Sequence, residues 1–157
     1  MAHLANVRFV INAIEREQEI AAMVSKHIEF FENNNIRFTR PVQSVDEEYD
    51  AEQYETYKIR LETEWTKREQ GFTERLLTFF QRPADLQFTV ELSNYGPLGF
   101  YNEKSNTITV NLNTHLDPVR TIMHEMVHIM LEPFIQKYRI EHNAKESIVN
   151  AVVGFLA

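Results

Sequence analysis

The stretch "MHEMVHIM", residues 123–130, places two histidines four positions apart, with a glutamate directly after the first. On an α-helix, residues at this spacing lie about 40° apart, so the imidazoles of His124 and His128 can reach one metal ion. Glu125 points to the side of that ion, where a carboxylate can accept a proton from water without binding the metal. The spacing therefore predicts the centre of a zinc hydrolase.

The residues around the motif predict a helix that is buried on most of its sides. Asp117 suits the N-cap and Pro118 the first helical position, while Pro133 is expected to end the helix. Apolar residues cover more than half of the circumference, which is wider than the roughly 100° stripe of a surface helix. The polar residues of this helix, which include the motif, face either a metal or water. If they face water, they are an ordinary solvated side of the helix.

A zinc site with an open position for water needs a third protein ligand. Glu146 follows His128 at a distance that lets the chain leave the first helix and return along a second, expected from about Asn143 to the end. Asn150, one turn later, could hydrogen-bond a coordinating histidine. The alternative for Glu146 is a capping box, in which its carboxylate accepts a hydrogen bond from the backbone amide of Asn143.

Upstream of the motif, the hydrophobic period changes from helical to alternating. Residues 86–92 and 107–112 each alternate, which predicts two strands that the segment "SNYGPLGFYNEKSN" joins as a hairpin. Polar side chains on the second strand point away from the core, so we expect an edge strand that binds an extended peptide through its backbone. These polar residues are Thr107, Thr109 and Asn111.

The N-terminal half predicts helices. Apolar residues recur at helical spacing from Val10 to Phe31 and again from about Glu48 to Phe80. The expected fold is a single α+β domain over residues 1–157, with a helical part at about 1–82 and a hairpin plus two helices at about 84–157. The N-terminal helices pack on a small antiparallel or mixed sheet. A separate hypothesis makes residues 1 to about 45 an inhibitory arm.

Composition limits the class of protein. The chain has 157 residues, a net charge of −7 and no cysteine. The negative charge argues against nucleic acid as a partner, because such binding depends on neutralised phosphates. No stretch is long and apolar enough for a membrane span, and the absence of cysteine favours a reducing compartment. We expect a cytoplasmic protein without a membrane partner, and the sequence does not indicate its oligomeric state.

Between about residues 95 and 155 the order of motifs resembles the gluzincin metallopeptidases, in particular the minigluzincins and the intracellular ImmA/IrrE-type proteases. The resemblance rests on "GFY", "NTITVNLN", an arginine four residues before the motif, "HEMVH" and "KESIVNAV". It implies a zincin-like fold, a protein or peptide substrate and an endopeptidase rather than an exopeptidase. It also implies one zinc ion on His124, His128 and Glu146, with Glu125 as the general base. Many gluzincins have an aspartate where this chain has Asn150.

Two questions stay open at this point. The developing oxyanion needs a donor besides the metal, and Tyr138 and His142, between the two helices, are the candidates. The alternative to a zinc peptidase is a catalytically silent zincin-like protein with a binding or regulatory role. Two histidines and a carboxylate could also hold a mononuclear iron, but Glu125 would then have no role.

Overall fold

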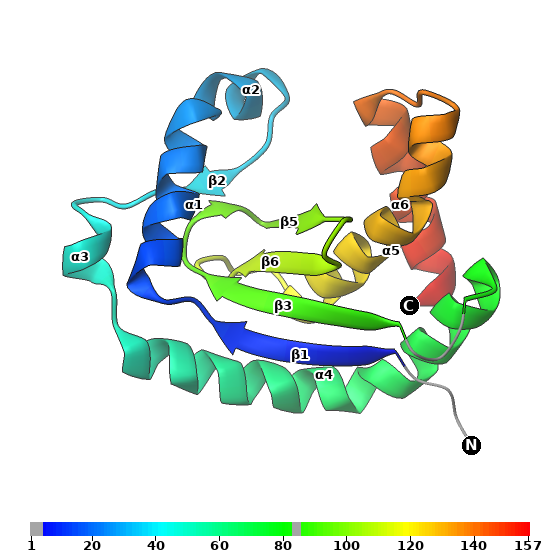
Figure 1. Ribbon diagram of the computed structural model, residues 1–157, viewed down its shortest axis with the longest axis horizontal. Coiled ribbons are helices and arrows are strands. Elements are labelled where there is room, and N and C mark those ends of the chain that lie inside the picture. The colour runs from blue at the N-terminus through cyan, green and yellow to red at the C-terminus, as the bar shows by residue number, and fades with distance from the viewer. Residues whose placement is uncertain (1–4, 83–85) are drawn as a thin grey trace.

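The structure is a computed structural model that describes residues 5–82 and 86–157. Its centre is a four-stranded mixed sheet with the strand order β1-β3-β6-β5 (Figure 1). Three strands run parallel and β5, at one edge, is antiparallel to its neighbour β6. The strands of this sheet are β1 (Asn6–Ile11), β3 (Gln87–Ser93), β5 (Gly99–Asn102) and β6 (Thr107–Asn111). A short β2 (Phe38–Thr39) pairs with β4 (Gly96–Pro97).

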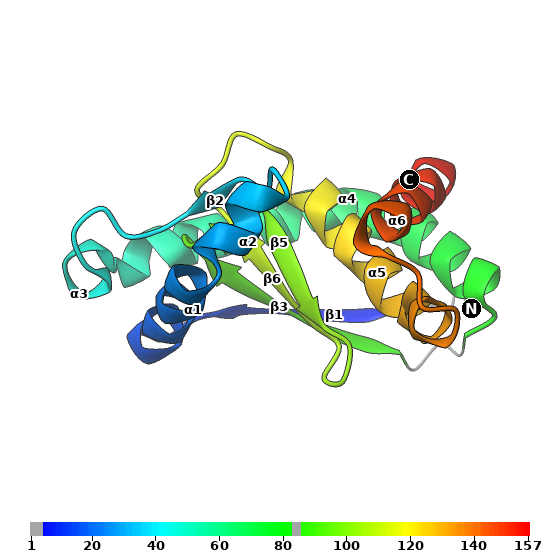
Figure 2. The same ribbon diagram turned by 90° about the horizontal axis from the view of Figure 1, so that it is seen from above.

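The helices surround this sheet. The longest, α4, runs along the sheet beside β1, while α1 and α2 stand at one end and α5 and α6 at the other (Figure 1). Seen from above, β5 and β6 lie between these two groups (Figure 2). The helices are α1 (Ile14–Lys26), α2 (Ile28–Asn33), α3 (Val45–Glu48), α4 (Ala51–Phe80), α5 (Pro118–Lys137) and α6 (His142–Leu156). The expected α+β class with a small mixed sheet is confirmed.

Helices cover one face of the sheet and part of the other. The main core joins Val90 and Ile108 on one face to Trp65 of α4 and to the apolar side of α5. On the other face, Glu91 accepts hydrogen bonds from Arg16 of α1 and from Thr109. The alternation of β3 and β6 therefore separates a helix-packed apolar face from a face with a buried polar network.

The expected helical stripe from Val10 to Phe31 is confirmed for α1 and α2, but Val10 itself lies in β1. This strand pairs in parallel with β3 over its whole length, and Phe9 packs edge-on against Trp65 at a centroid distance of 6.4 Å. The N-terminal part is therefore not only helical. Residues 6–11 form β1 within the sheet, and the hypothesis that residues 1 to about 45 act as an inhibitory arm stays a prediction.

The expected hairpin and edge strand are wrong as well. The strands β3 and β6 are parallel neighbours, and the hairpin is formed by β5 and β6. Because β6 is paired on both sides, Thr107, Thr109 and Asn111 do not offer a free edge. Thr109 and Asn111 are buried, and Asn111 donates hydrogen bonds to Thr39 Oγ1 and the carbonyl of Gly96. Their polarity serves this internal network.

The helices of the motif begin as expected. Asp117 caps α5 by accepting a hydrogen bond from the amide of Val119 at 3.0 Å, and Pro118 is the first helical residue. Pro133 does not end α5, since burial of Ile135 in the core keeps the last turn helical. Across residues 5–82 and 86–157, no helix has the length and apolar character to cross a membrane.

Candidate metal centre

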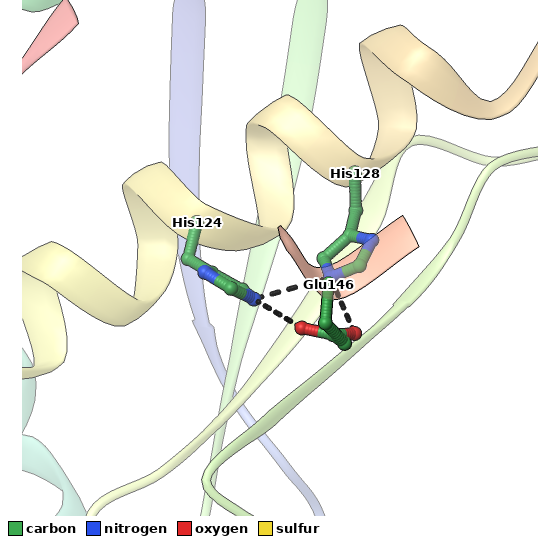
Figure 3. A group of neighbouring side chains, drawn as sticks. All are labelled: His124, His128 and Glu146. Atoms are coloured by element: carbon green, nitrogen blue, oxygen red, sulfur yellow. Dashed lines mark hydrogen bonds and ion pairs between the residues drawn. The ribbon is translucent and has the colours of Figure 1, made fainter. Parts of the chain in front are cut away.

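Three side chains from α5 and α6 point toward one another (Figure 3). The Nε2 atoms of His124 and His128 lie 3.1 Å apart. Glu146 places Oε2 at 3.2 Å from the first and Oε1 at 3.1 Å from the second. Tetrahedral zinc with bonds of about 2.0–2.1 Å holds its ligand nitrogens roughly 3.3 Å apart, so this spacing fits. The group could hold a metal ion.

The local sequence explains how the three ligands meet. His124 and His128 are one turn apart on α5, and the chain then returns along α6 to present Glu146. Glu141 occupies the N-cap of α6, so Asn143 is already inside the helix. A capping box between Asn143 and Glu146 is therefore wrong, and the carboxylate of Glu146 turns to the two imidazoles instead.

The burial of Glu125 and His128 excludes the alternative that the motif is an ordinary solvated side of the helix. Glu125 is 6% exposed and His128 is 3% exposed. Burial raises the pKa of Glu125 to about 7, although the charge of His124 opposes this. A carboxyl group with such a pKa can both accept and release a proton near neutral pH. This is the requirement for a general base that later acts as an acid.

The charges of the ligands favour a cation. Hydrogen bonds first with His124 and then with His128 lower the pKa of Glu146, so its carboxylate is ionised. Burial lowers the pKa of His128. For His124, burial is outweighed by the hydrogen bond with Glu146 and the charge of Glu125, which raise its pKa. A neutral imidazole and an ionised carboxylate are the forms that bind a divalent metal.

The edge strand β5 packs closely against α5 beside Glu125. A Cβ atom on Gly99 would lie 2.6 Å from Cγ2 of Thr121 and 3.1 Å from Oε1 of Glu125. The first distance is shorter than van der Waals contact, so only glycine fits without a shift. This close approach brings the backbone of β5 next to the carboxylate of Glu125.

Tyr101 on β5 is a site residue that the sequence analysis missed. Its ring stacks on the imidazole of His128 with centroids 5.0 Å apart. Its hydroxyl donates to Glu132 at 2.8 Å and accepts from Nζ of Lys145 at 3.3 Å. These contacts fix the ring of His128. The signal for this strand is the aromatic pair in "GFYN", followed by the turn residues "EKSN".

The metal centre lies in a cleft of about 920 Å³. Its walls come from α2 and the segment before β2, from β4 and β5, from the first half of α5 and from the start of α6. A second hollow of about 660 Å³ shares Ile36, Arg37 and Leu98 with it. The three candidate ligands and Glu125 line the first cleft, and the second hollow adjoins it at these shared residues.

The other predicted site residues, His142, Tyr138 and Asn150, lie in different surroundings. His142 lines the cleft. The centroid of its ring lies 6.3 Å from the ring centroid of Phe30 on α2. Tyr138 is 64% exposed at the C-cap of α5 and is not among the residues that line the cleft. Asn150 is exposed, and no hydrogen bond joins it to His124 or His128 in the described part of the chain. The structure brings only His142 of these three to the centre.

Comparison of the chain with protein-family models, with curated proteins and with solved structures gives no significant match. The class of protein is therefore argued from the fold and from the chemistry of the site. These define a mixed α+β domain with a group of two histidines and one glutamate that could hold a metal ion.

Proposed function

We propose that this protein is a zinc-dependent metallopeptidase of the gluzincin type, with His124, His128 and Glu146 as the ligands. The convergence of these three side chains beside the buried Glu125 carries the proposal. Zinc held by these three side chains would lower the pKa of a bound water and polarise a carbonyl group. The donor set suits zinc, because imidazole nitrogen and carboxylate oxygen at three positions leave room for water.

Glu125 is the general base of the proposed reaction. Its carboxylate accepts a proton from the attacking water and then passes that proton to the amine nitrogen that leaves. The peptide C–N bond breaks, while the carbonyl carbon gains the hydroxyl oxygen. The pKa of about 7 suits both proton transfers near neutral pH.

The outer edge of β5 is the proposed binding site for the peptide backbone. Gly99, Phe100 and Tyr101 line the cleft, and β5 is the last strand of its sheet. An extended peptide can add to such an edge through main-chain hydrogen bonds. A second hollow adjoins the cleft at Leu98, and a peptide that extends into it on one side of the ligands would suit an endopeptidase better than an exopeptidase. A protein or peptide is therefore the proposed substrate.

His142 is the proposed donor to the oxyanion that develops on the carbonyl. It is the one of the two sequence candidates that lines the cleft. Lys145 lines the same cleft and brings its ammonium group near the site. A donor aimed at the developing charge contributes in the transition state more than in the ground state.

A second candidate function is a zincin-like binding or regulatory protein without turnover. The contact between Phe30 and His142 favours it, because this pair of rings joins α2 to α6 at a residue that lines the cleft. A substrate would have to separate these rings in order to use His142.

Comparison of wild type with Glu125→Gln separates the two functions. Both proteins are loaded with zinc and incubated with unfolded proteins and a peptide mixture, and the products are identified by mass spectrometry. We expect internal cleavage by wild type and a loss of on the order of 100-fold or more in the variant, with equal zinc content. Equal cleavage by both would remove Glu125 as the base. No cleavage by the zinc-loaded wild type would favour the silent protein.

A further inference from the structure

Two arginines stand at the end of the cleft where β5 begins. Phe38 pairs with Pro97 in the β2–β4 ladder, so Arg37, one residue earlier, stands level with Leu98. Arg120 lies on α5 one turn before His124 and on the same face. Both side chains line the cleft together with Leu98. Two cations from separate elements therefore line the cleft on the side of Leu98.

The positive charge of these arginines is not neutralised within the described residues. Asp117 is close by, but its carboxylate accepts a hydrogen bond from Arg68 at 2.7 Å. No ion pair joins Arg37 or Arg120 to a carboxylate in residues 5–82 and 86–157. The other two carboxylates of the lining, Glu125 and Glu146, already have roles in the proposed reaction. This end of the cleft is thus cationic in a chain whose net charge is −7.

The distance from the reacting centre follows from the paths of β5 and α5. Gly99 approaches Glu125, and Tyr101 stacks on His128, so β5 and α5 pass the metal ligands in the same direction. One helical turn, from His124 back to Arg120, covers about 6 Å. An extended peptide covers that distance with about two residues.

We propose that Arg37 and Arg120 form a carboxylate-binding subsite, which selects peptides with a carboxylate about two residues from the bond that is cleaved. The location of that bond rests on the proposed peptidase function. Guanidinium groups are planar, permanently charged and suited to bidentate hydrogen bonds with a carboxylate. The carboxylate comes from an aspartate or glutamate side chain, or from the free C-terminus of the peptide.

Matched peptides test this subsite. One series carries glutamate or glutamine at each position on either side of the cleaved bond, and another has a free or an amidated C-terminus. For zinc-loaded wild type, we expect kcat/KM to be about 10-fold higher for the peptide with the carboxylate than for its matched neutral peptide. This difference should occur for glutamate at one position or for the free C-terminus. The ratio should fall toward one in Arg37→Gln and Arg120→Gln. Arg60→Gln, an exposed arginine on α4 outside the cleft, should keep the wild-type ratio.

A binding measurement separates this inference from the peptidase itself. Fluorescence anisotropy with zinc-loaded Glu125→Gln records the affinity for the same labelled peptides without turnover. Cleavage without a carboxylate preference would overturn the subsite and leave the peptidase. Selective binding that depends on both arginines, but without cleavage by wild type, would support the subsite and remove the peptidase. Absence of selective binding, or selectivity that persists in the double variant, would overturn the subsite.

Discussion

Oε1 of Glu146 lies 3.1 Å from Nε2 of His128, and this contact joins α6 to α5 at the centre of the cleft. The same carboxylate reaches His124 through its other oxygen. Without a metal, protons on the imidazoles are needed to make these contacts favourable. A divalent cation displaces those protons, because it binds the unprotonated forms. Metal and proton binding therefore compete at this site.

Glu146→Gln should weaken zinc binding by on the order of 100-fold or more, because it removes a charged ligand. The affinity is measured by competition with a chromophoric chelator at constant pH. Glu141→Gln is the matched control, since Glu141 is exposed just before α6 and its side chain makes no capping hydrogen bond. It should bind zinc as wild type does. Wild-type affinity in Glu146→Gln would show that this carboxylate is not a ligand.

The raised pKa of Glu125 makes the stability of the metal-free protein depend on pH. Between 4.5, its ordinary value, and about 7 the folded protein binds more protons than the unfolded chain. The free energy of unfolding therefore falls as the pH rises through this range, by about 3 kcal/mol at most. Glu125→Gln cannot ionise, so it should gain stability relative to wild type from pH about 5 to about 8.

Urea unfolding in the presence of a chelator measures this difference at each pH. The comparison of two proteins cancels the titration of groups that they share. Glu15→Gln, which changes an exposed carboxylate on α1, should follow the wild-type curve. Parallel curves for wild type and Glu125→Gln would mean that Glu125 titrates alike in the folded and unfolded protein.

The convergence of His124, His128 and Glu146 was the part that the sequence predicted best, because the spacing of the motif is local. His124, Glu125 and His128 lie within two turns of one helix, so their relative directions follow from the helical period alone. Glu146 needed only a second helix that returns to the first. Tyr138 does not lie at the site as expected, because no such constraint acts on a residue at the end of α5. Its side chain is exposed to solvent.

The sheet could not be predicted in the same way, because strand order is a property of distant residues. Alternation marked β3 and β6 as strands but did not indicate their neighbours. Asn111 is polar because it binds Thr39 and Gly96 inside the fold, which alternation cannot distinguish from solvent exposure. The true edge strand, β5, has only four residues, too few for a clear period.

Gly99→Ala should lower peptidase activity without preventing folding. The new methyl group would lie 2.6 Å from Thr121 Cγ2 and 3.1 Å from Glu125 Oε1, so β5 must move away from α5 or the side chain of Glu125 must turn. Such overpacking costs about 1–3 kcal/mol of stability. We expect on the order of a 10-fold loss or more in kcat/KM, measured with a peptide that wild type cleaves.

Gly154→Ala is the matched control for this substitution. Gly154 lies within α6, and a Cβ atom there would meet no atom within 4 Å. Alanine favours the helix by about 1 kcal/mol, so this variant should be more stable than wild type and equally active. Full activity in Gly99→Ala would mean that β5 can retreat without disturbing Glu125, and that its close approach is not needed for catalysis.

The buried Glu17 should be important for stability but not for zinc binding. Its carboxylate accepts hydrogen bonds from the hydroxyl of Tyr54, from Ser93 Oγ at 2.6 Å and from the amide of Asn94 at 3.1 Å. Glu17→Gln replaces one accepting oxygen by an amide that can only donate, so at least one buried donor loses its partner. We expect a loss of about 2 kcal/mol in the free energy of unfolding.

Urea unfolding measures this loss, and Glu15→Gln on the exposed side of α1 should show almost none. Zinc affinity should be equal in all three proteins, because the ligands lie on α5 and α6. A zinc affinity that falls together with stability in Glu17→Gln would mean that the position of α1 controls the metal centre.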